Sequence, residues 1–222
     1  MPDTPDMTIV LTFLRQLDKH NERPWFEAHR KDYDSAHDEF ELLVNILIGQ
    51  LSSIEDLAGL TAKDCMMRIY RDVRFSKDKS PYRTSFAASL APGGRKSWRM
   101  GWYVHLEPGD QSMVAGGLYQ PGPPMLAHFR QSIDEDPRAF RKIINAASFK
   151  KYFGEIEGES LKSAPQGYPK DHPDINLLRM KSVTAVHHLS DAEVLAEDFS
   201  THVVKACKAM KPFLDYFNAL HD

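Results

Sequence analysis

The sequence predicts an α+β fold, in which helices at the N-terminal and C-terminal ends of the chain enclose a mostly antiparallel sheet of about four to six strands. Three observations predict it. Apolar residues recur at helical spacing in residues 1–60 and in most of 121–222. Short alternating segments separated by turn formers fill residues 65–120. With 222 residues, 42% of them apolar, the chain can bury a core of its own, so we expect a single domain over 1–222.

Two amphipathic helices are expected before residue 60. The first covers residues 8–19, with Thr8 as its N-cap. The second is a long helix of about 25 residues, because Tyr33, Phe40 and Leu47 belong to an apolar stripe with the spacing of one helix face. The outer face of this helix is acidic through Asp32, Asp34, Asp38, Glu39 and Glu41.

Four segments between residues 65 and 120 are expected to form an antiparallel meander. They are MRIYRDVRF, TSFAASLA, GWYVHLEP and SMVAGGLY, and the connections between them are rich in turn formers. Helices return after residue 121, where Pro137 begins one helix and Gly154 closes the run. A loop with three prolines then precedes one late strand, LLRMKSVTAVHHLS, and two closing helices, the second with Ser200 as its N-cap.

Composition excludes several classes of protein. The longest apolar run, LLVNILIGQL, is shorter than the ~20 residues that a membrane span needs, and the N-terminus lacks the basic and apolar regions of an export signal. The two cysteines, Cys65 and Cys207, have no metal-ligand or redox spacing, so we interpret them as buried, reduced thiols. We therefore expect a cytoplasmic protein with no membrane partner.

Charge is distributed unevenly along the chain, although the net charge is only −3. Residues 1–62 carry five Lys/Arg and twelve Asp/Glu, a net charge of −7, whereas residues 63–99 carry ten Lys/Arg and three Asp, a net charge of +7. A short, strongly basic segment therefore lies within an acidic protein.

This basic segment predicts an anion-binding site. If RIYRDVRF is a strand, its alternation places Arg68, Asp72 and Arg74 on one face and Arg71 on the opposite, apolar face. Guanidinium groups suit phosphate or carboxylate because their planar fork binds two oxygens at once. The predicted ligand-binding residues are Arg68, Arg71, Asp72, Arg74, Lys77, Asp78, Lys79, Tyr82, Arg95 and Lys96. The two aspartates would orient the cations, the tyrosine would supply a hydroxyl, and Arg83 in the same turn would complete the cradle.

Two alternatives stay open. The acidic face of the long N-terminal helix could lie across the basic segment, so that an ion-pair scaffold neutralises it with no ligand at all. Alternatively, the segment binds nucleic acid without catalysis, with cations on the phosphates and aromatic side chains such as Trp98 stacking on bases.

No other motif defines a chemistry. APGGRKS lacks the first glycine of a phosphate-binding loop and the helix that would follow it, so we interpret it as a flexible hairpin tip. The ten histidines show no metal-ligand spacing, so we expect no metal and no cofactor. His105 and His172 are candidate general bases and Cys65 is a candidate nucleophile, but a structural role explains each of them better.

Four stretches of the sequence are distinctive: NERPWFEAHRKDY, RIYRDVRFSKDKSPYRTSFAASLAPGGRK, GWYVHLEPG with GGLYQP, and GYPKDHPDINLLRMKS. With them the chain resembles the DUF2461 family of bacterial and fungal proteins over nearly its whole length. The family signature RxxRDxRF followed by DKxxY maps onto Arg68, Arg71, Asp72, Arg74, Phe75, Asp78, Lys79 and Tyr82. The resemblance implies no activity, because the family is one of unknown function.

The first functional hypothesis is therefore an anion-binding protein whose partner is a phosphate-bearing small molecule. If the protein is an enzyme, transfer or hydrolysis at phosphorus suits such a site, with arginines stabilising the developing charge. The sequence leaves the substrate, any catalytic base and the oligomeric state open.

Overall fold

The computed structural model describes residues 4–221 and confirms the α+β fold. Its antiparallel sheet has four strands in the order β1-β2-β3-β4, at the low end of the predicted range. The chain forms two compact units. Unit 1 comprises residues up to 97, 102–114 and 188–205, and unit 2 comprises 98–101, 115–187 and those from 206 onward. The single domain predicted from the sequence stays a prediction.

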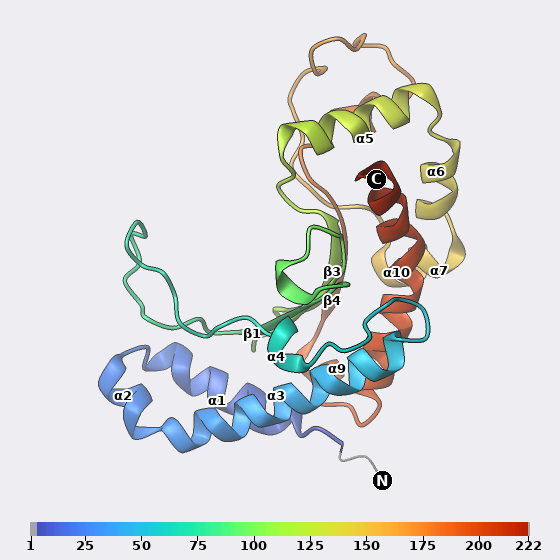
Figure 1. Ribbon diagram of the computed structural model, residues 1–222. Helices are drawn as coiled ribbons and strands as arrows, with labels where there is room; N and C mark the ends of the chain where they lie inside the picture. Colours follow the sequence, from blue (N-terminus) through green and yellow to red (C-terminus); the bar gives the residue numbers. More distant parts are fainter. Residues whose placement is uncertain (1–3, 222) are drawn as a thin grey trace. The chain divides into compact units, whose positions relative to one another are not determined.

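Unit 1 begins with the helices α1 (Met7–Lys19), α2 (Arg23–Ala28) and α3 (Arg30–Leu51). α1 packs along α3, and the short helix α2 connects the two in sequence (Figure 1). The N-cap of α1 is Asp6 and not Thr8, because the Asp6 carboxylate accepts a 2.8 Å hydrogen bond from the Thr8 amide. The predicted long helix is divided, because the chain leaves helical geometry at His29 and α3 has 22 residues.

Apolar side chains of α1 and α3 form the core of unit 1. Phe13 of α1 meets Tyr33 of α3 edge-on, with 5.8 Å between ring centroids, and stacks against Phe86 of the first strand at 6.2 Å. Such aromatic pairs add to the free energy gained from apolar burial. The periodic apolar residues Leu14 and Phe40, which predict these helices, lie in this core and are almost completely buried.

β1 (Phe86–Leu90) and β2 (Trp102–Leu106) lie in unit 1 and pair antiparallel. Their connection holds the 3-10 helix η1 (Gly94–Lys96), which packs on α4 (Ala62–Cys65). Gly94 has a φ of 73°, and a Cβ there would lie 2.7 Å from the Asp64 carbonyl oxygen. This stretch is therefore a packed turn and not the loose hairpin tip that we predict from APGGRKS.

The prediction of a first strand at MRIYRDVRF is wrong. Residues 66–85, which we call the basic loop, pair only through the isolated bridges Met66↔Ala88 and Tyr70↔Tyr82. The predicted alternation of faces fails with the strand. Phe75 is four residues after Arg71 and so would share its apolar face, but it is 96% exposed. Within unit 1 the basic loop extends outward from β1 (Figure 1).

Local hydrogen bonds explain why the basic loop is not a strand. The Asp72 carboxylate accepts from the Arg74 amide at 3.3 Å, and the Asp78 carboxylate accepts from the Ser80 amide at 2.9 Å. These bonds give the backbone an alternative to a strand ladder. Pro81 has no amide hydrogen to contribute to a ladder. Hydrophobic alternation in this stretch is therefore outweighed by turn chemistry.

The remaining elements are β3 (Ser112–Leu118), β4 (Val183–Leu189), α5 (Pro123–Glu135), α6 (Arg138–Ile144), α7 (Ala147–Phe153), α8 (Ile175–Leu178), α9 (Asp191–Val194) and α10 (Phe199–His221). The two predicted closing helices are a single turn, α9, and one long helix, so Ser200 lies inside α10 and is not a cap. No helix within residues 4–221 is long and apolar enough to span a bilayer.

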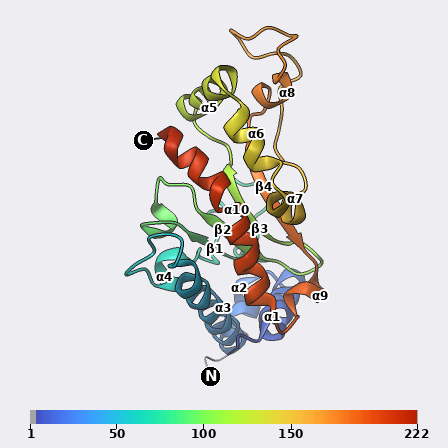
Figure 2. The same cartoon turned by 90° about the vertical axis from the view of Figure 1, so that its right-hand side faces the viewer.

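Two glycines of β3 let α10 approach the sheet in unit 2. A Cβ on Gly116 would lie 2.5 Å from the Met210 sulfur, and one on Gly117 would lie 2.7 Å from the Phe213 ring. A larger residue at either position would therefore have to displace these α10 side chains. The adjoining core is built from the buried aromatic residues Phe129, Phe140, Phe149, Phe213 and Phe217. Figure 2 shows α5 and α8 next to each other in this unit.

Candidate functional site

A polar hollow of about 370 Å³ lies in unit 1 beside the basic loop. We call it the Arg71 hollow. Its volume is in the range of small-molecule sites. Its lining residues come from the end of α1, the turn after it and both arms of the basic loop: Asp18, Asn21, Arg71, Asp78, Ser80, Tyr82, Arg83, Thr84 and Ser85.

The wall of the Arg71 hollow is fixed by a clamp between Asn21 and Tyr82. The side-chain nitrogen of Asn21 donates to the Tyr82 backbone carbonyl at 3.0 Å, and the side-chain oxygen of Asn21 accepts from the Tyr82 backbone amide at 3.1 Å. The Tyr82 ring is buried and stacks on Phe26, with 4.0 Å between centroids, and burial raises the pKa of its hydroxyl. Tyr82 therefore anchors the basic loop to α2.

Arg71 is the half-buried cation of the Arg71 hollow. Its Nη1 group donates to the Asp78 carboxylate and to the Ser80 carbonyl oxygen, the latter at 3.2 Å. Hydrogen bonds from the Ser80 hydroxyl and amide, together with the Arg71 guanidinium, hold the pKa of Asp78 well below its ordinary value. Every hydrogen bond that Arg71 donates from its side chain to residues 4–221 leaves from Nη1, so its Nε and Nη2 groups point to no protein acceptor.

Arg83 and Asp18 are the unpaired charges of the Arg71 hollow. Both side chains belong to exposed residues, and neither forms an ion pair or a side-chain hydrogen bond with the described part of the chain, residues 4–221. Arg83 is held in place by its backbone, whose amide donates to the Ile69 carbonyl at 2.8 Å. A free guanidinium and a free carboxylate thus share one hollow.

The structure brings three of the predicted ligand-binding residues, Arg71, Asp78 and Tyr82, into the Arg71 hollow and disperses the others. Arg74 pairs with Asp72 at 2.6 Å, and both side chains are exposed. Lys79 donates to the Val73 carbonyl at 3.0 Å. The other four predicted residues also lie outside the lining: Arg68 and Lys77 are exposed, Lys96 is exposed on η1, and Arg95 donates to the Lys63 carbonyl beside α4.

Arg71 and Arg74 of the basic loop pair with carboxylates of the loop itself and not with those of α3. Asp72 forms an ion pair with Arg74, and Asp78 forms one with Arg71. Within residues 4–221, no carboxylate of the acidic α3 face forms an ion pair with a cation of residues 68–83. The side-chain contact from α3 to the loop is a long hydrogen bond of 3.5 Å from Arg30 to the Tyr70 hydroxyl.

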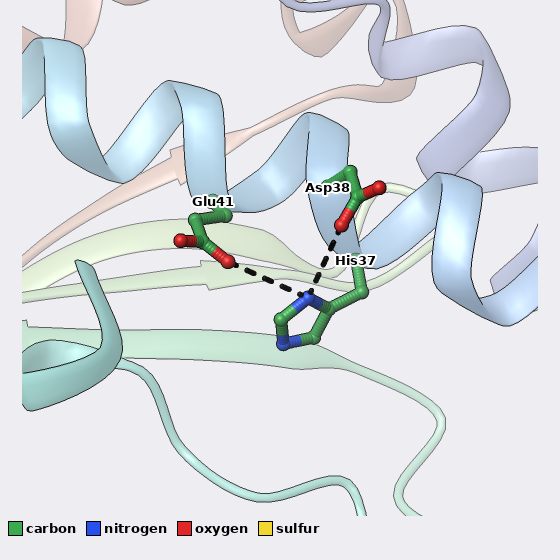
Figure 3. Close-up of side chains that lie close together, drawn as sticks. All are labelled: His37, Asp38 and Glu41. Carbon is green, nitrogen blue, oxygen red and sulfur yellow. Dashed lines mark ion pairs between the residues drawn. The ribbon is translucent and has the colours of Figure 1, made fainter.

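One group on α3 has the residue types of a metal site. His37, Asp38 and Glu41 each offer one ligand atom, and these atoms lie within 4.8 Å of one another (Figure 3). His37 Nδ1 lies 3.9 Å from Asp38 and 3.8 Å from Glu41, which are ion pairs when the imidazole is protonated. The cluster comes from one exposed turn of helix, and its spacing along α3 explains it without a metal.

His105 is not the isolated base that the sequence suggests. Its Nε2 lies 2.9 Å from Glu107 and its Nδ1 lies 3.2 Å from the Tyr103 hydroxyl. The other oxygen of Glu107 accepts from the Thr84 hydroxyl at 2.8 Å. Tyr103 and His105 of β2 and Glu107 directly after it lie on the same side of the chain, because residues alternate along a strand. Their chain of hydrogen bonds ends at Thr84 in the wall of the Arg71 hollow.

The remaining sequence candidates have structural surroundings. Burial and the neighbouring Asp64 carboxylate raise the pKa of the Cys65 thiol to about 11, so it is not an activated nucleophile. Both cysteines are buried thiols, as predicted. In unit 2, His172 Nδ1 accepts from the Asp174 amide at 2.9 Å and its Nε2 lies 3.2 Å from Asp134.

Fold and site together define an α+β protein with a polar hollow beside a basic loop. The chain belongs to the DUF2461 family, whose model, described as a conserved hypothetical protein, matches residues 9–216. The predicted family resemblance is thus confirmed, and the family description names no activity. No curated protein and no solved structure matches the sequence.

Sequence reasoning missed several residues of the Arg71 hollow. Asn21 lies 61 residues before its partner Tyr82, Asp18 lies earlier still, and nothing in their local pattern connects them to the basic loop. Thr84 and Ser85 are the last residues of the basic loop but carry no charge, so a count of charged residues does not identify them. The available signal was the NERPW stretch, which begins at Asn21 and belongs to the family resemblance.

Proposed function

We propose that the protein binds a small anion, in the first instance a phosphate ester, in the Arg71 hollow. The observation that carries the proposal is the free guanidinium of Arg83 in the same hollow as the unused Nε and Nη2 donors of Arg71. Two convergent guanidinium groups can bind the oxygens of one phosphate or carboxylate with charge-assisted hydrogen bonds.

Pre-organisation supports the proposal. Asp78 and the Ser80 carbonyl hold Arg71, and the Asn21 clamp holds the backbone next to Arg83. An anion would therefore meet donors whose backbone and, for Arg71, side chain are already ordered, which lowers the entropic cost of binding. Ser85 adds a hydroxyl to the same wall.

Calorimetric titration with ethyl phosphate at constant ionic strength tests the proposal. We expect Arg83→Ala to weaken binding by about tenfold or more, because a charge-assisted hydrogen bond is worth roughly 1.5–3 kcal/mol. Arg138→Ala is the matched control, since Arg138 is an exposed arginine of unit 2 outside the hollow. Equal losses in the two variants, or no binding by the unmodified protein, would contradict the proposal.

Binding of single-stranded nucleic acid is the second candidate function. Phe75 is 96% exposed within the basic loop, and the Arg74 guanidinium lies 5.9 Å from its ring centroid. An exposed aromatic ring among cations suits base stacking combined with phosphate contacts. This candidate predicts an affinity that falls steeply with salt and drops in Phe75→Ala, measured by fluorescence anisotropy with a labelled oligonucleotide. A phosphate-ester site alone predicts no effect of Phe75→Ala.

A further inference from the structure

The Arg71 hollow carries acceptor groups beyond the guanidinium donors that a simple anion needs. Asp78 and Arg71 neutralise each other, which leaves one positive charge, Arg83, and one negative charge, Asp18. A doubly charged phosphate with no other polar group would bring its own negative charge close to the unpaired carboxylate of Asp18. Like charges in one hollow repel each other, so such a ligand would use only half of the site.

Two hydroxyl groups of the hollow already donate hydrogen bonds to carboxylates. The Thr84 hydroxyl donates to Glu107 at 2.8 Å, and the Ser80 hydroxyl donates to Asp78 at 2.6 Å. Each hydroxyl has a single proton, so both oxygens can only accept a hydrogen bond from a ligand. Together with the Asp18 carboxylate they give the hollow acceptors for a ligand, in addition to its guanidinium donors.

We infer that the Arg71 hollow recognises a small zwitterion, in which an anionic group and an ammonium group are joined by a short linker. This inference rests on the proposed function and extends it. The anionic group meets Arg83 and the unused donors of Arg71, and the ammonium, with three donors and no acceptor, meets Asp18 and the hydroxyl oxygens of Thr84 and Ser80. A hollow of about 370 Å³ has room for a molecule of this size.

Three ligands that differ by one group test the inference by calorimetric titration at pH 7.5 and constant ionic strength. Ethyl phosphate carries only the anion, O-phosphoethanolamine carries the anion and the ammonium, and ethanolamine carries only the ammonium. We expect O-phosphoethanolamine to bind about tenfold more tightly than ethyl phosphate, the effect of one added charge-assisted contact.

Asp18→Asn and a matched control variant locate the effect. Asp18→Asn should abolish the difference between the two phosphates, because it removes the carboxylate that attracts the ammonium and repels a phosphate without one. Asp171→Asn makes the same charge change at an exposed residue of unit 2 and should retain the difference. Asp18 is near the C-terminus of α1, where removal of a negative charge does not weaken the helix, so the variant should fold.

Each outcome decides one of the two proposals. If both phosphates bind with equal affinity, the zwitterion inference is overturned and the proposed anion site stands. If ethanolamine binds as tightly as O-phosphoethanolamine, the inference is overturned because the anion contributes nothing. If none of the three ligands binds, the proposed function fails together with the inference. A preference for O-phosphoethanolamine that persists in Asp18→Asn also overturns the inference.

Discussion

The basic loop of unit 1 and the loop of residues 155–182 in unit 2, which we call the proline loop, both depend on arginines but use them differently. In the proline loop, Arg179 donates to the Leu161 carbonyl at 2.7 Å, and Arg130 of α5 donates to the carbonyls of Leu178 and Met180 at 2.8 and 3.2 Å. In the basic loop, the arginine donors are satisfied only in part. The difference separates cations that hold a loop together from cations that remain available to a ligand.

Burial follows the same division. Asp174 in the proline loop is 6% exposed and accepts a 2.7 Å hydrogen bond from Arg141 of α6. The corresponding pair in the basic loop, Arg74 with Asp72, is exposed on both sides. Exposed pairs contribute little to stability, whereas a buried carboxylate depends on its partner. Arginine-rich sequence alone therefore does not identify a binding site, because the partners of each guanidinium decide its role.

The largest effect is expected in the proline loop. Asp174→Ala should lower the free energy of unfolding by about 2–3 kcal/mol, because it removes a buried carboxylate that joins the loop to α6. Urea denaturation monitored by circular dichroism measures the change. Asp72→Ala is the control at an exposed pair and should change stability far less. Similar losses of unfolding free energy in the two variants would contradict the difference between the buried and the exposed pair.

A smaller effect is expected for Arg130→Ala. The loss of two hydrogen bonds to loop carbonyls should lower the free energy of unfolding by about 1–2 kcal/mol. Burial also lowers the pKa of the Arg130 guanidinium, in keeping with a structural position. Arg130→Lys should recover little of the stability, since an ammonium lacks the fork that reaches both carbonyls. Full rescue by lysine in urea denaturation would show that charge, and not hydrogen bonding, stabilises the loop.

Acid should loosen the basic loop locally and only at low pH. The folded pKa of Asp78 lies below its unfolded value, so the contacts of its carboxylate with Ser80 and Arg71 are fully present above about pH 4. They are lost as the pH falls through the lower folded pKa. The amide resonance of Ser80, followed by NMR from pH 6 downward, should therefore titrate with a midpoint below 3.8, the ordinary value for an aspartate. A midpoint at or above that value would contradict the Asp78 contacts, and Asp78→Asn should remove the titration.

The smallest effect on stability is expected at Arg83, the residue on which ligand binding depends most. Arg83→Ala should change the free energy of unfolding by less than about 0.5 kcal/mol in the absence of ligand, since the side chain forms no ion pair within residues 4–221. Thermal unfolding without added anions measures it. A loss comparable to that of Arg130→Ala would place Arg83 among the structural arginines and weaken the proposed site.

Periodic patterns in the sequence are enough to locate most of the helices and strands. Helical spacing of apolar residues locates α1, α3 and the helices after residue 121, and alternation locates β1, β2 and β3, because these patterns reflect which faces are buried. The predicted late strand, LLRMKSVTAVHHLS, contains β4. The family was also readable from the sequence, as the match over residues 9–216 confirms. Charge counting pointed to the basic loop and to Arg71, Asp78 and Arg83.

The environment of each charged group follows only from the folded structure. The short-range hydrogen bonds of Asp72 and Asp78 convert a predicted strand into a loop, and residues distant in sequence, such as Asn21 and Asp18, complete the hollow. Neither result follows from periodicity, because periodicity records burial along one element and carries no information on which polar groups meet across the fold. The role of a guanidinium depends on its acceptors, and the fold alone brings those acceptors within hydrogen-bonding distance.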